Sequence, residues 1–308
     1  MKTLSMPSSG NNTFDTCSTK RVSYILATRN RAEFLRKSLE GQRTLFSPED
    51  ELIIVDGLSS DHTAEVVSQF SNLIDIFISE PDWGPADAWN KGILLARGKY
   101  VKTLTDDDTI HTEGMAQAIA VMEKHPEVDL LVCGGTKQRG NKISTTWVSP
   151  GTNYGGSVKD VFIHGATGIG HVYRRRAFSK IGLLDVVNLA TDQEFAVRAI
   201  NLRATIKFCR INLYHHPILD HSVTVAQAKN HEKHSNALLK EYTSSGYYFG
   251  FRLNRFLRRR PPLYRLLATP PYVAVLLKEK GPRVTAGKIA RALFKKKPAT
   301  IPGPEDYS

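Results

Sequence analysis

The most constraining feature of this sequence is an alternation of short apolar runs with amphipathic segments between residues 22 and 133. The apolar runs are rich in β-branched residues, which is typical of buried strands, and the segments between them repeat their apolar positions at helical spacing. The expected strands are residues 22–28, 52–55, 75–79, 100–104 and 128–133, and the expected helices include 32–42, 63–70 and 113–124. This alternation predicts an α/β fold with a mostly parallel, Rossmann-like sheet and helices on both faces.

Another helix is expected after the turn at Gly84, because Trp89 and Ile93 belong to a set of apolar residues at helical spacing. Its expected end is Gly98, since glycine adopts a left-handed helix cap at little cost. Beyond Cys133 the pattern loosens. We expect a loop at 134–156 with a strand at 142–148, a glycine-rich mobile segment at 165–170, strands at 172–176 and 205–208, and helices at 177–181, from Asp192 onward and at 227–242.

The length of 308 residues allows one large domain and an appendage. Residues 1–20 are polar and carry no apolar signal segment, so we expect a disordered leader and a cytoplasmic protein. No run of about 18 apolar residues is present to span a bilayer. The expected division is a catalytic domain at 21–225 and a helical, basic region at 226–308. Cys17, Cys133 and Cys209 lack metal-ligand spacing, and we expect reduced thiols, with Cys133 and Cys209 buried in strands.

The positive charge of the chain is concentrated near its C-terminal end. Residues 252–297 hold 14 of the 42 Lys and Arg but one of the 30 acidic residues, which leaves 28 basic and 29 acidic residues elsewhere. These basic residues alternate with aliphatic and aromatic ones, a pattern that binds anionic lipid headgroups. We therefore expect peripheral attachment to the cytoplasmic face of the inner membrane. A solvated basic face or an oligomer contact is the alternative.

Three successive carboxylates, Asp106, Asp107 and Asp108, follow the strand at 100–104. Ligands of an open α/β sheet bind at the carboxyl ends of its strands, which is where this cluster falls. Adjacent negative charges repel each other, so a cation is expected there, and Mg²⁺ or Mn²⁺ binds carboxylates while keeping positions for substrate phosphates. Neither a GxGxxG nor a P-loop motif follows any strand, so a bound nucleotide would need a metal for its phosphates. The alternative is a solvated acidic turn that caps the next helix.

Residues 22–224 resemble the family 2 glycosyltransferases, inverting enzymes of the GT-A fold that use nucleotide-diphosphate sugars. The similarity is greatest to the branch that builds bacterial surface polysaccharides, whose pattern is roughly EPDxGxxDAxNKGxxxAxGxYxxxLxxDD. The matching positions are Glu80, Pro81, Asp82, Gly84, Asp87, Ala88, Asn90, Lys91, Gly92, Ala96, Gly98, Tyr100, Leu104, Asp107 and Asp108. A match at so many positions in register is far more specific evidence for the family than an isolated DxD motif.

The resemblance implies a nucleotide-sugar site at the ends of the first strands. Thr28, Asn30 and Arg31 correspond to the family's first turn and would approach the base and phosphates, although Ala27 and Arg29 replace its usual Pro and Tyr. Asp56 corresponds to the aspartate that binds the base, usually uracil. Gly57-Leu58 replaces the residues that commonly follow this aspartate, so the identity of the base stays open.

The remaining donor-site residues come from the opening motif and the carboxylate cluster. The resemblance implies that Asp82 and Lys91 line the donor site, that Asp107 and Asp108 belong to the metal site with Asp107 near the ribose, and that Asp108 rather than Asp107 is the direct metal ligand. The alternative for Lys91 is that it is a surface lysine. The alternative for Asp56 and Asp82 is that they are simple turn residues.

The segment at 192–198 matches the family's catalytic helix through Asp192, Glu194, Phe195 and Arg198. Asp192 is then the candidate general base, because an acceptor hydroxyl attacks well only when a carboxylate takes its proton. Glu194 is expected on the acceptor side. The alternative is that Asp192 is simply the helix N-cap.

Among the histidines His215, His216 and His221, His221 is the one placed best to complete the metal shell, as a histidine does in some GT-A enzymes. A structural or surface role is the alternative. The expected partners are a nucleotide-sugar donor, a UDP-sugar above all, a glycan or lipid-linked acceptor, and an anionic membrane surface.

Two other classes of protein would account for part of the sequence. A nucleic-acid-binding protein would fit the basic region, but that region carries no nucleic-acid motif. A sugar nucleotidyltransferase would need a glycine-rich basic loop after the first strand, and residues 29–31 contain no glycine.

Overall fold

The computed structural model describes residues 20–146, 158, 161–162, 168–218, 227–249 and 252. The chain divides into two compact units, Met1–Thr243 and Ser244–Ser308. The first unit therefore continues beyond residue 225 and includes the helix α10 (Ala228–Tyr242). Residues 1–19 of the expected leader at 1–20, His221, and almost all of the basic run at 252–297 lie outside the described residues, whereas Lys20 is the first residue of β1.

The strands of the first unit are β1 (Lys20–Thr28), β2 (Glu51–Asp56), β3 (Ile76–Ser79), β4 (Gly98–Thr105), β5 (Thr109–Ile110), β6 (Leu130–Arg139), β7 (Lys142–Thr146), β8 (His171–Arg174) and β9 (Ile206–Pro217). They form one sheet in the order β3-β2-β1-β4-β8-β6-β9-β5, with β7 paired to β6. β1 to β4 pair in parallel, and so do β6 and β9, whereas β8 runs antiparallel between β4 and β6. The predicted α/β fold with a mostly parallel sheet is confirmed.

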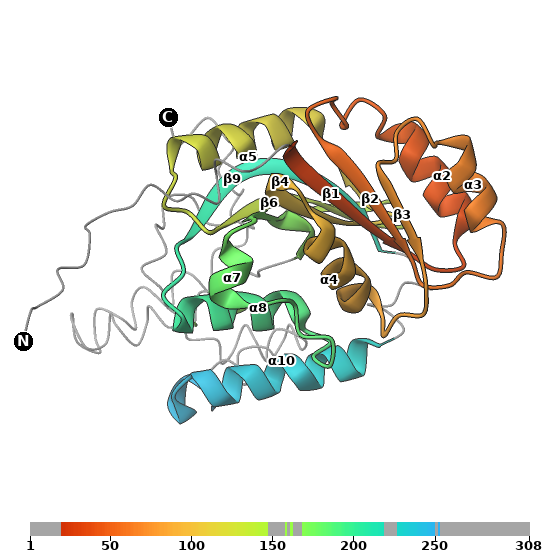
Figure 1. The fold of residues 1–308 in the computed structure, drawn as a ribbon. Helices are drawn as coiled ribbons and strands as arrows, with labels where there is room; N and C mark the ends of the chain where they lie inside the picture. The colour runs from red at the N-terminus through yellow and green to blue at the C-terminus, as the bar shows by residue number, and fades with distance from the viewer. Residues whose placement is uncertain are drawn as a thin grey trace, which may run out of the picture. The chain divides into compact units, whose positions relative to one another are not determined.

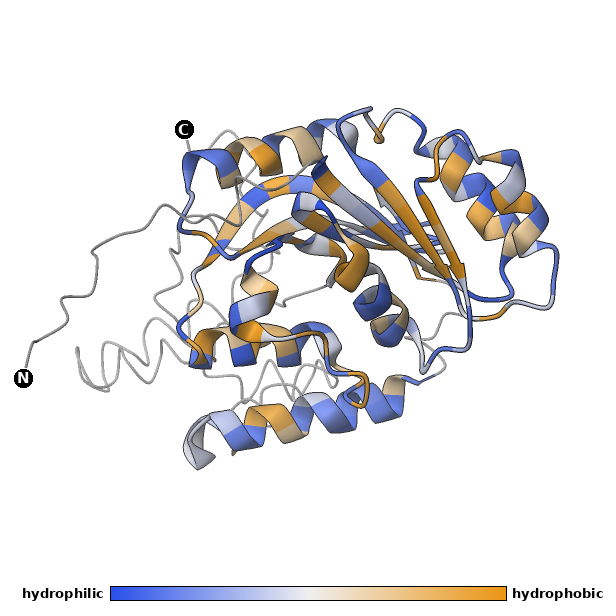
Figure 2. Cartoon of the chain, viewed as in Figure 1, coloured by the Kyte–Doolittle hydropathy of each residue, from blue (hydrophilic) through white to orange (hydrophobic). Residues whose placement is uncertain are grey.

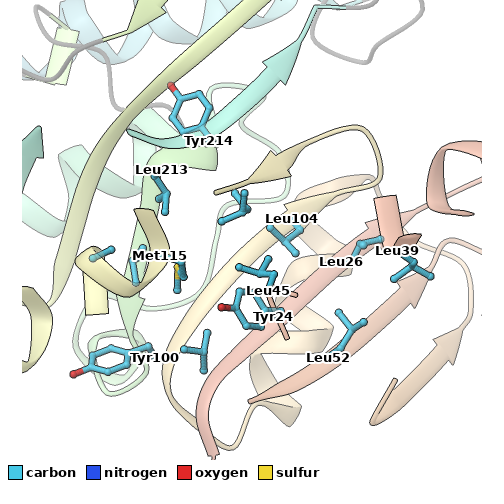
Figure 3. Close-up of a cluster of buried hydrophobic side chains, with 14 of the residues drawn as sticks. Tyr24, Leu26, Leu39, Leu45, Leu52, Tyr100, Leu104, Met115, Leu213 and Tyr214 are labelled. Atoms are coloured by element: carbon cyan, nitrogen blue, oxygen red, sulfur yellow. The ribbon is translucent and has the colours of Figure 1, made fainter. Parts of the chain in front are cut away.

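Helices cover both faces of this sheet (Figure 1). They are α2 (Ala32–Gly41), α3 (Thr63–Gln69), α4 (Pro85–Leu95), α5 (Thr112–Lys124), α7 (Ala177–Ile181) and α8 (Thr191–Asn201), with the 3₁₀ turn η1 (Gly168–Gly170) before β8. Side chains alternate across each strand, so Tyr24 and Leu26 of β1 join the core under α2, α3 and α5, while Ile25 joins the core under α4, α7 and α8. Figure 3 shows the first of these cores.

Helix α10 is amphipathic, with hydrophilic and hydrophobic residues interspersed along it (Figure 2). Its buried residues are Leu238 and Leu239, and it packs against α8. No helix in the described part of the chain is both long enough and apolar enough to cross a bilayer.

The expected cap at Gly98 is wrong. Helix α4 ends at Leu95, and Gly98 is instead the first residue of β4, without the positive φ of Gly84, Gly140 and Gly182. A Cβ at Gly98 would lie 2.5 Å from the backbone nitrogen of Ser23, so glycine is needed here for close strand packing and not for a turn.

Three strands differ most from the expectation. β5 has two residues and was not expected, β6 continues to Arg139 where a loop was expected from residue 134, and β9 continues to Pro217 where the predicted strand ended at Phe208. Cys133 and Cys209 are free thiols that face each other in the register of β6 and β9. Cys133 is buried as expected, whereas Cys209 is half-buried.

Candidate functional site

The three consecutive aspartates lie at the end of β4 against the turn that follows β1. The hydroxyl of Thr28 donates to Oδ2 of Asp106 at 2.7 Å. The guanidinium of Arg31 pairs with Asp106 at 3.0 Å through Nη1 and with Asp107 at 3.0 Å through Nη2. The turn residue Arg31 therefore offsets the mutual repulsion of two of the three carboxylates.

Asp106 is the most deeply buried member of the cluster, with 3% of its surface exposed. Burial raises its pKa to about 6, against the opposing effect of Arg31. Because Thr28 and Arg31 both contact it, Asp106 is the residue that joins β4 to the turn after β1. Sequence reasoning gave it no separate role.

Asp108 is held between its own strand and β9. Its Oδ2 accepts from the hydroxyl of Thr105, and its Oδ1 lies 2.6 Å from Nδ1 of His216. The contact arises because β5 directly follows Asp108 and pairs with β9, with Thr109 opposite His215. His216 is thus the histidine that the described residues bring to the cluster, while the predicted His221 lies outside them.

The pair of Asp108 and His216 tests whether the implied Mg²⁺ or Mn²⁺ fits here. No group of three or more His, Cys, Asp and Glu side chains able to hold a metal occurs among the described residues. Such ions commonly bind through one or two carboxylates and fill their remaining positions with water and substrate phosphates. One carboxylate beside one imidazole at the edge of the sheet is compatible with that mode of binding.

Asp56 lies at the end of β2, directly opposite Thr28 of β1 in the strand register. It is buried, with 2% exposure, and accepts hydrogen bonds from the Ser59 backbone at 3.0 Å and the Ser79 hydroxyl at 2.6 Å. These bonds fix the carboxylate at the same rim of the sheet as the three aspartates. Asp56 therefore closes the turn after its strand and lies beside Thr28, the residue that contacts Asp106.

Asn30 and Asp82 shape the loops around Asp56. Asn30 adopts a left-handed conformation with φ of 52°, and its Oδ1 accepts from the Ser60 backbone at 2.7 Å. A Cβ on Gly57 would lie 2.3 Å from Oδ2 of Asp82, so glycine lets the two loops approach each other. Asn30 and Asp82 therefore belong to the loops that border Asp56.

Lys91 lies on α4, where its ammonium group has several partners. It donates to the carbonyl of Pro81 at 2.6 Å and pairs with Glu80 at 2.9 Å and Asp87 at 3.5 Å. Asp82 accepts from the Gly84 backbone at 2.9 Å in the same turn. Lys91 is thus tied to the segment that opens α4, and a contact with a donor would compete with these bonds.

Asp192 lies in the first turn of α8. The N-cap of this helix is Ala190, so the interpretation of Asp192 as the N-cap is wrong. Its Oδ2 accepts from the backbone of Gly168 at 3.1 Å, and its Oδ1 from the backbone of Gln193 at 2.8 Å. Burial raises the pKa of Asp192, against the opposing charge of His231.

Lys137 connects the two ends of the site. It is the register partner of His216 in the pairing of β6 with β9, and its ammonium group interacts electrostatically with both Asp192 and Asp108. Burial lowers the pKa of Lys137. Asp108 and Asp192 therefore lie near one shared cation, at the rim that also holds Asp56.

Glu194 lies one turn along α8 from Ala190 and forms an ion pair with Arg198 at 2.7 Å. Arg198 in turn donates to the carbonyl groups of Ile181 and Leu183. Glu194 thus orients an arginine that caps the end of α7, and its acceptor-side role stays a prediction.

Lys137 and His216 were missed as site residues, and one signal would have found His216. In the sequence, apolar residues continue to alternate with polar ones past Phe208, at Ile211 and Leu213, and extending the strand to Pro217 would have carried His216 to the rim. The sequence carries no such signal for Lys137, because a lysine at the polar end of a strand ordinarily faces solvent.

Comparison with known proteins is consistent with this geometry. The profile of Glycosyl transferase family 2 matches residues 23–182, just over half of the chain. The poly-beta-1,6-N-acetyl-D-glucosamine synthase of Staphylococcus epidermidis is 34% identical over 109 residues, which are 35% of this chain and 26% of that protein. The putative glycosyltransferase EpsH of Bacillus subtilis is 26% identical over 219 residues, which are 65% of this chain and 61% of that protein. The chain thus spans less than two thirds of the length of these curated relatives.

Two solved structures share the fold. S. aureus TarS 1–349 in complex with UDP-GlcNAc has a TM-score of 0.58 at 18% identity, covering 89% of this chain and 81% of that one. The mannosyltransferase PcManGT from Pyrobaculum calidifontis, in complex with GDP-Man and Mn²⁺, has a TM-score of 0.56 at 17% identity, with the same coverage. The GT-A fold implied by the sequence resemblance is confirmed. By the match over residues 23–182, the chain belongs to glycosyl transferase family 2.

Proposed function

We propose that this protein is a metal-dependent, inverting glycosyltransferase. It moves a sugar from a nucleotide-diphosphate sugar, a UDP-sugar above all, to a hydroxyl of a glycan or lipid-linked acceptor in cell-surface polysaccharide or lipopolysaccharide synthesis. The observation that carries the proposal is the gathering of Thr28, Asp56, Asp108 and Asp192 at one rim of the sheet in a family 2 chain.

The donor would lie along the ends of β1, β2 and β4. Asp56 would offer an acceptor for the base, and Asp107, which lies 3.0 Å from Arg31, would face the ribose and phosphates together with it. Asp108 and His216 would hold Mn²⁺ or Mg²⁺, which when bound neutralises the charge on the diphosphate leaving group. Two solved structures with this fold contain UDP-GlcNAc and GDP-Man, so both bases belong in the test.

The acceptor would be activated by Asp192. In the ionised state its carboxylate takes the proton of the acceptor hydroxyl while that oxygen bonds to the anomeric carbon and the bond to the diphosphate breaks. Attack on the face opposite the leaving group inverts the anomeric centre. The bonds from Gly168 and Gln193 support this role because they limit rotation of the carboxylate.

A surface glycan as the acceptor is supported by the relatives, whose printed names include poly-beta-1,6-N-acetyl-D-glucosamine synthase and the poly(ribitol-phosphate) beta-N-acetylglucosaminyltransferase TarS. The 14 basic residues at 252–297 support attachment to an anionic membrane, where a lipid-linked acceptor would be available. The location at the cytoplasmic face of the inner membrane is part of the same proposal.

A panel of UDP- and GDP-sugars tests the proposal by thermal shift, with Mn²⁺ or with EDTA. A ligand at a concentration of about 100 times its Kd stabilises a protein by about 2.7 kcal/mol. The donor should therefore raise Tm by several degrees with Mn²⁺ and much less with EDTA. NMR of the product should show an inverted anomeric centre. A donor whose effect is the same in EDTA contradicts the metal, and a retained anomer contradicts the mechanism.

The pH profile should report Asp192. Because burial raises its pKa, the acid limb of kcat/KM should lie above the range of an exposed aspartate, with activity rising as pH increases and the carboxylate ionises. His231 opposes this shift, and Lys137 does so to a smaller extent. His231→Gln should therefore move the acid limb to higher pH. Lys233→Gln, at an exposed position of the same helix, is the control, and an unmoved limb in His231→Gln would contradict the assignment.

A further inference from the structure

A buried lysine lies beneath the site with no part in the reaction as described above. Lys102 of β4 has 0% of its surface exposed, although lysines are almost never fully buried. Its Nζ donates to the carbonyl of Ile169 at 2.7 Å and to that of Thr103 at 3.0 Å. Burial lowers its pKa to about 8, so the ammonium form still predominates at neutral pH. Removing an ammonium group from water is costly. The burial of the Lys102 ammonium group against one specific segment therefore requires an explanation.

The carbonyl that Lys102 binds belongs to η1, the turn that contacts Asp192. Ile169 is the middle residue of η1, and the backbone N–H of the preceding Gly168 donates to Oδ2 of Asp192 at 3.1 Å. On the other side of the turn, a Cβ on Gly170 would lie 2.4 Å from the carbonyl oxygen of Cys133. η1 is therefore pressed against β6 and tied to β4, with little room to shift.

The same strand carries both ends of the site. β4 continues from Lys102 through Thr105 to the three aspartates, while the hydrogen bond of Lys102 reaches the turn that holds Asp192. We propose that Lys102 is a positioning residue: it anchors η1 to β4, so that the Gly168 N–H orients Asp192 relative to the donor bound at the end of that strand. This inference rests on the proposed function, because it assumes that Asp192 is the general base.

The expected consequence is a loss of turnover without a loss of donor binding. A catalytic group displaced by about 1 Å can cost about 100-fold in rate. Lys102→Met keeps the aliphatic length but removes both hydrogen bonds, and we expect kcat to fall by about 10- to 100-fold while the donor Kd stays within about threefold. Lys99→Met is the matched control on the same strand. Its ammonium group pairs with Glu123, away from η1, and activity should be unchanged.

A double-mutant cycle separates positioning from a general structural effect. If Lys102 acts through Asp192, then Lys102→Met should lower kcat by less than about twofold in an Asp192→Asn background, because residues that act as a unit are strongly non-additive. An equal loss in both backgrounds would overturn the inference. If Asp192→Asn alone leaves turnover intact, the general-base role within the proposed function fails instead, whereas absence of transfer by the wild type with every donor would remove the proposed function itself, so these failures are distinct.

A second variant addresses the case in which Lys102→Met does not fold. Gly168→Pro removes the N–H that Asp192 accepts and leaves Lys102 in place, and it should reproduce the loss of kcat at unchanged donor affinity. Gly168→Ala keeps the N–H, and its methyl would meet Cβ of Asp192 at an ordinary contact distance of 3.4 Å. A loss in Gly168→Ala as large as in Gly168→Pro would contradict a role for this hydrogen bond.

Discussion

Asp192→Asn should leave donor affinity within about threefold of wild type while kcat falls by about 10³-fold, within the range that general base catalysis contributes. The amide cannot take the proton of the acceptor hydroxyl, yet its oxygen can still accept from the Gly168 backbone, so the local structure should persist. Steady-state kinetics with a defined acceptor and calorimetric titration of the donor measure the two quantities separately.

Asp75→Asn is the matched control for this change. Asp75 lies at the opposite edge of the sheet, where it accepts from the Leu52 backbone at 3.1 Å and pairs with Lys20 at 3.3 Å. Its replacement should lower the free energy of unfolding and leave kcat unchanged. Substantial surviving transfer by Asp192→Asn would remove the general-base role.

Asp108→Asn should abolish the metal dependence of donor binding. In the wild type, Mn²⁺ should tighten the binding of the UDP-sugar by at least about 100-fold relative to EDTA, since an ion held by Asp108 and His216 would offset the charge of the diphosphate. The asparagine oxygen carries no net charge, and His216 alone gives a weak site, so the variant should bind the donor equally in both conditions. Calorimetry with and without Mn²⁺ is the measurement.

The response of Asp108→Asn to Mn²⁺ decides whether Asp108 holds the metal. Donor binding by Asp108→Asn that is still tightened by Mn²⁺ to the wild-type extent would falsify the metal assignment. His216→Gln should weaken the effect of Mn²⁺ by a smaller factor, because the carboxylate remains. The Tm of each ligand-free variant checks that the fold is intact, and Asp75→Asn again serves as the control substitution.

The part of the fold that is local in sequence could be predicted from the residues. β1, β2 and β4 are apolar runs whose side chains are mostly buried on both faces of the sheet, whereas the edge strand β3 is only partly buried, and each of the four was expected within a few residues of its observed ends. The rule that ligands meet the carboxyl ends of parallel strands then brought Thr28, Asp56 and the three aspartates to one rim. The family resemblance added the candidate general base.

The parts that depend on distant pairing could not be predicted in the same way. A two-residue strand such as β5 has no detectable period, and nothing near β8 in the sequence specifies its antiparallel place between β4 and β6. His216 was not expected at the cluster because the last strand was ended too early. Lys102 reads as an ordinary polar residue of a strand, and only the packing of η1 shows why its charge is buried.

The short strand β5 has a consequence for how the protein matures. Asp108 meets His216 only because Thr109 pairs with His215, a residue that is synthesised long after it. Domains generally fold as units during synthesis. A nascent chain that stops before Ile206 holds Asp56 and the three aspartates but lacks His216, so under the proposed function its metal site would stay incomplete until β9 has been synthesised.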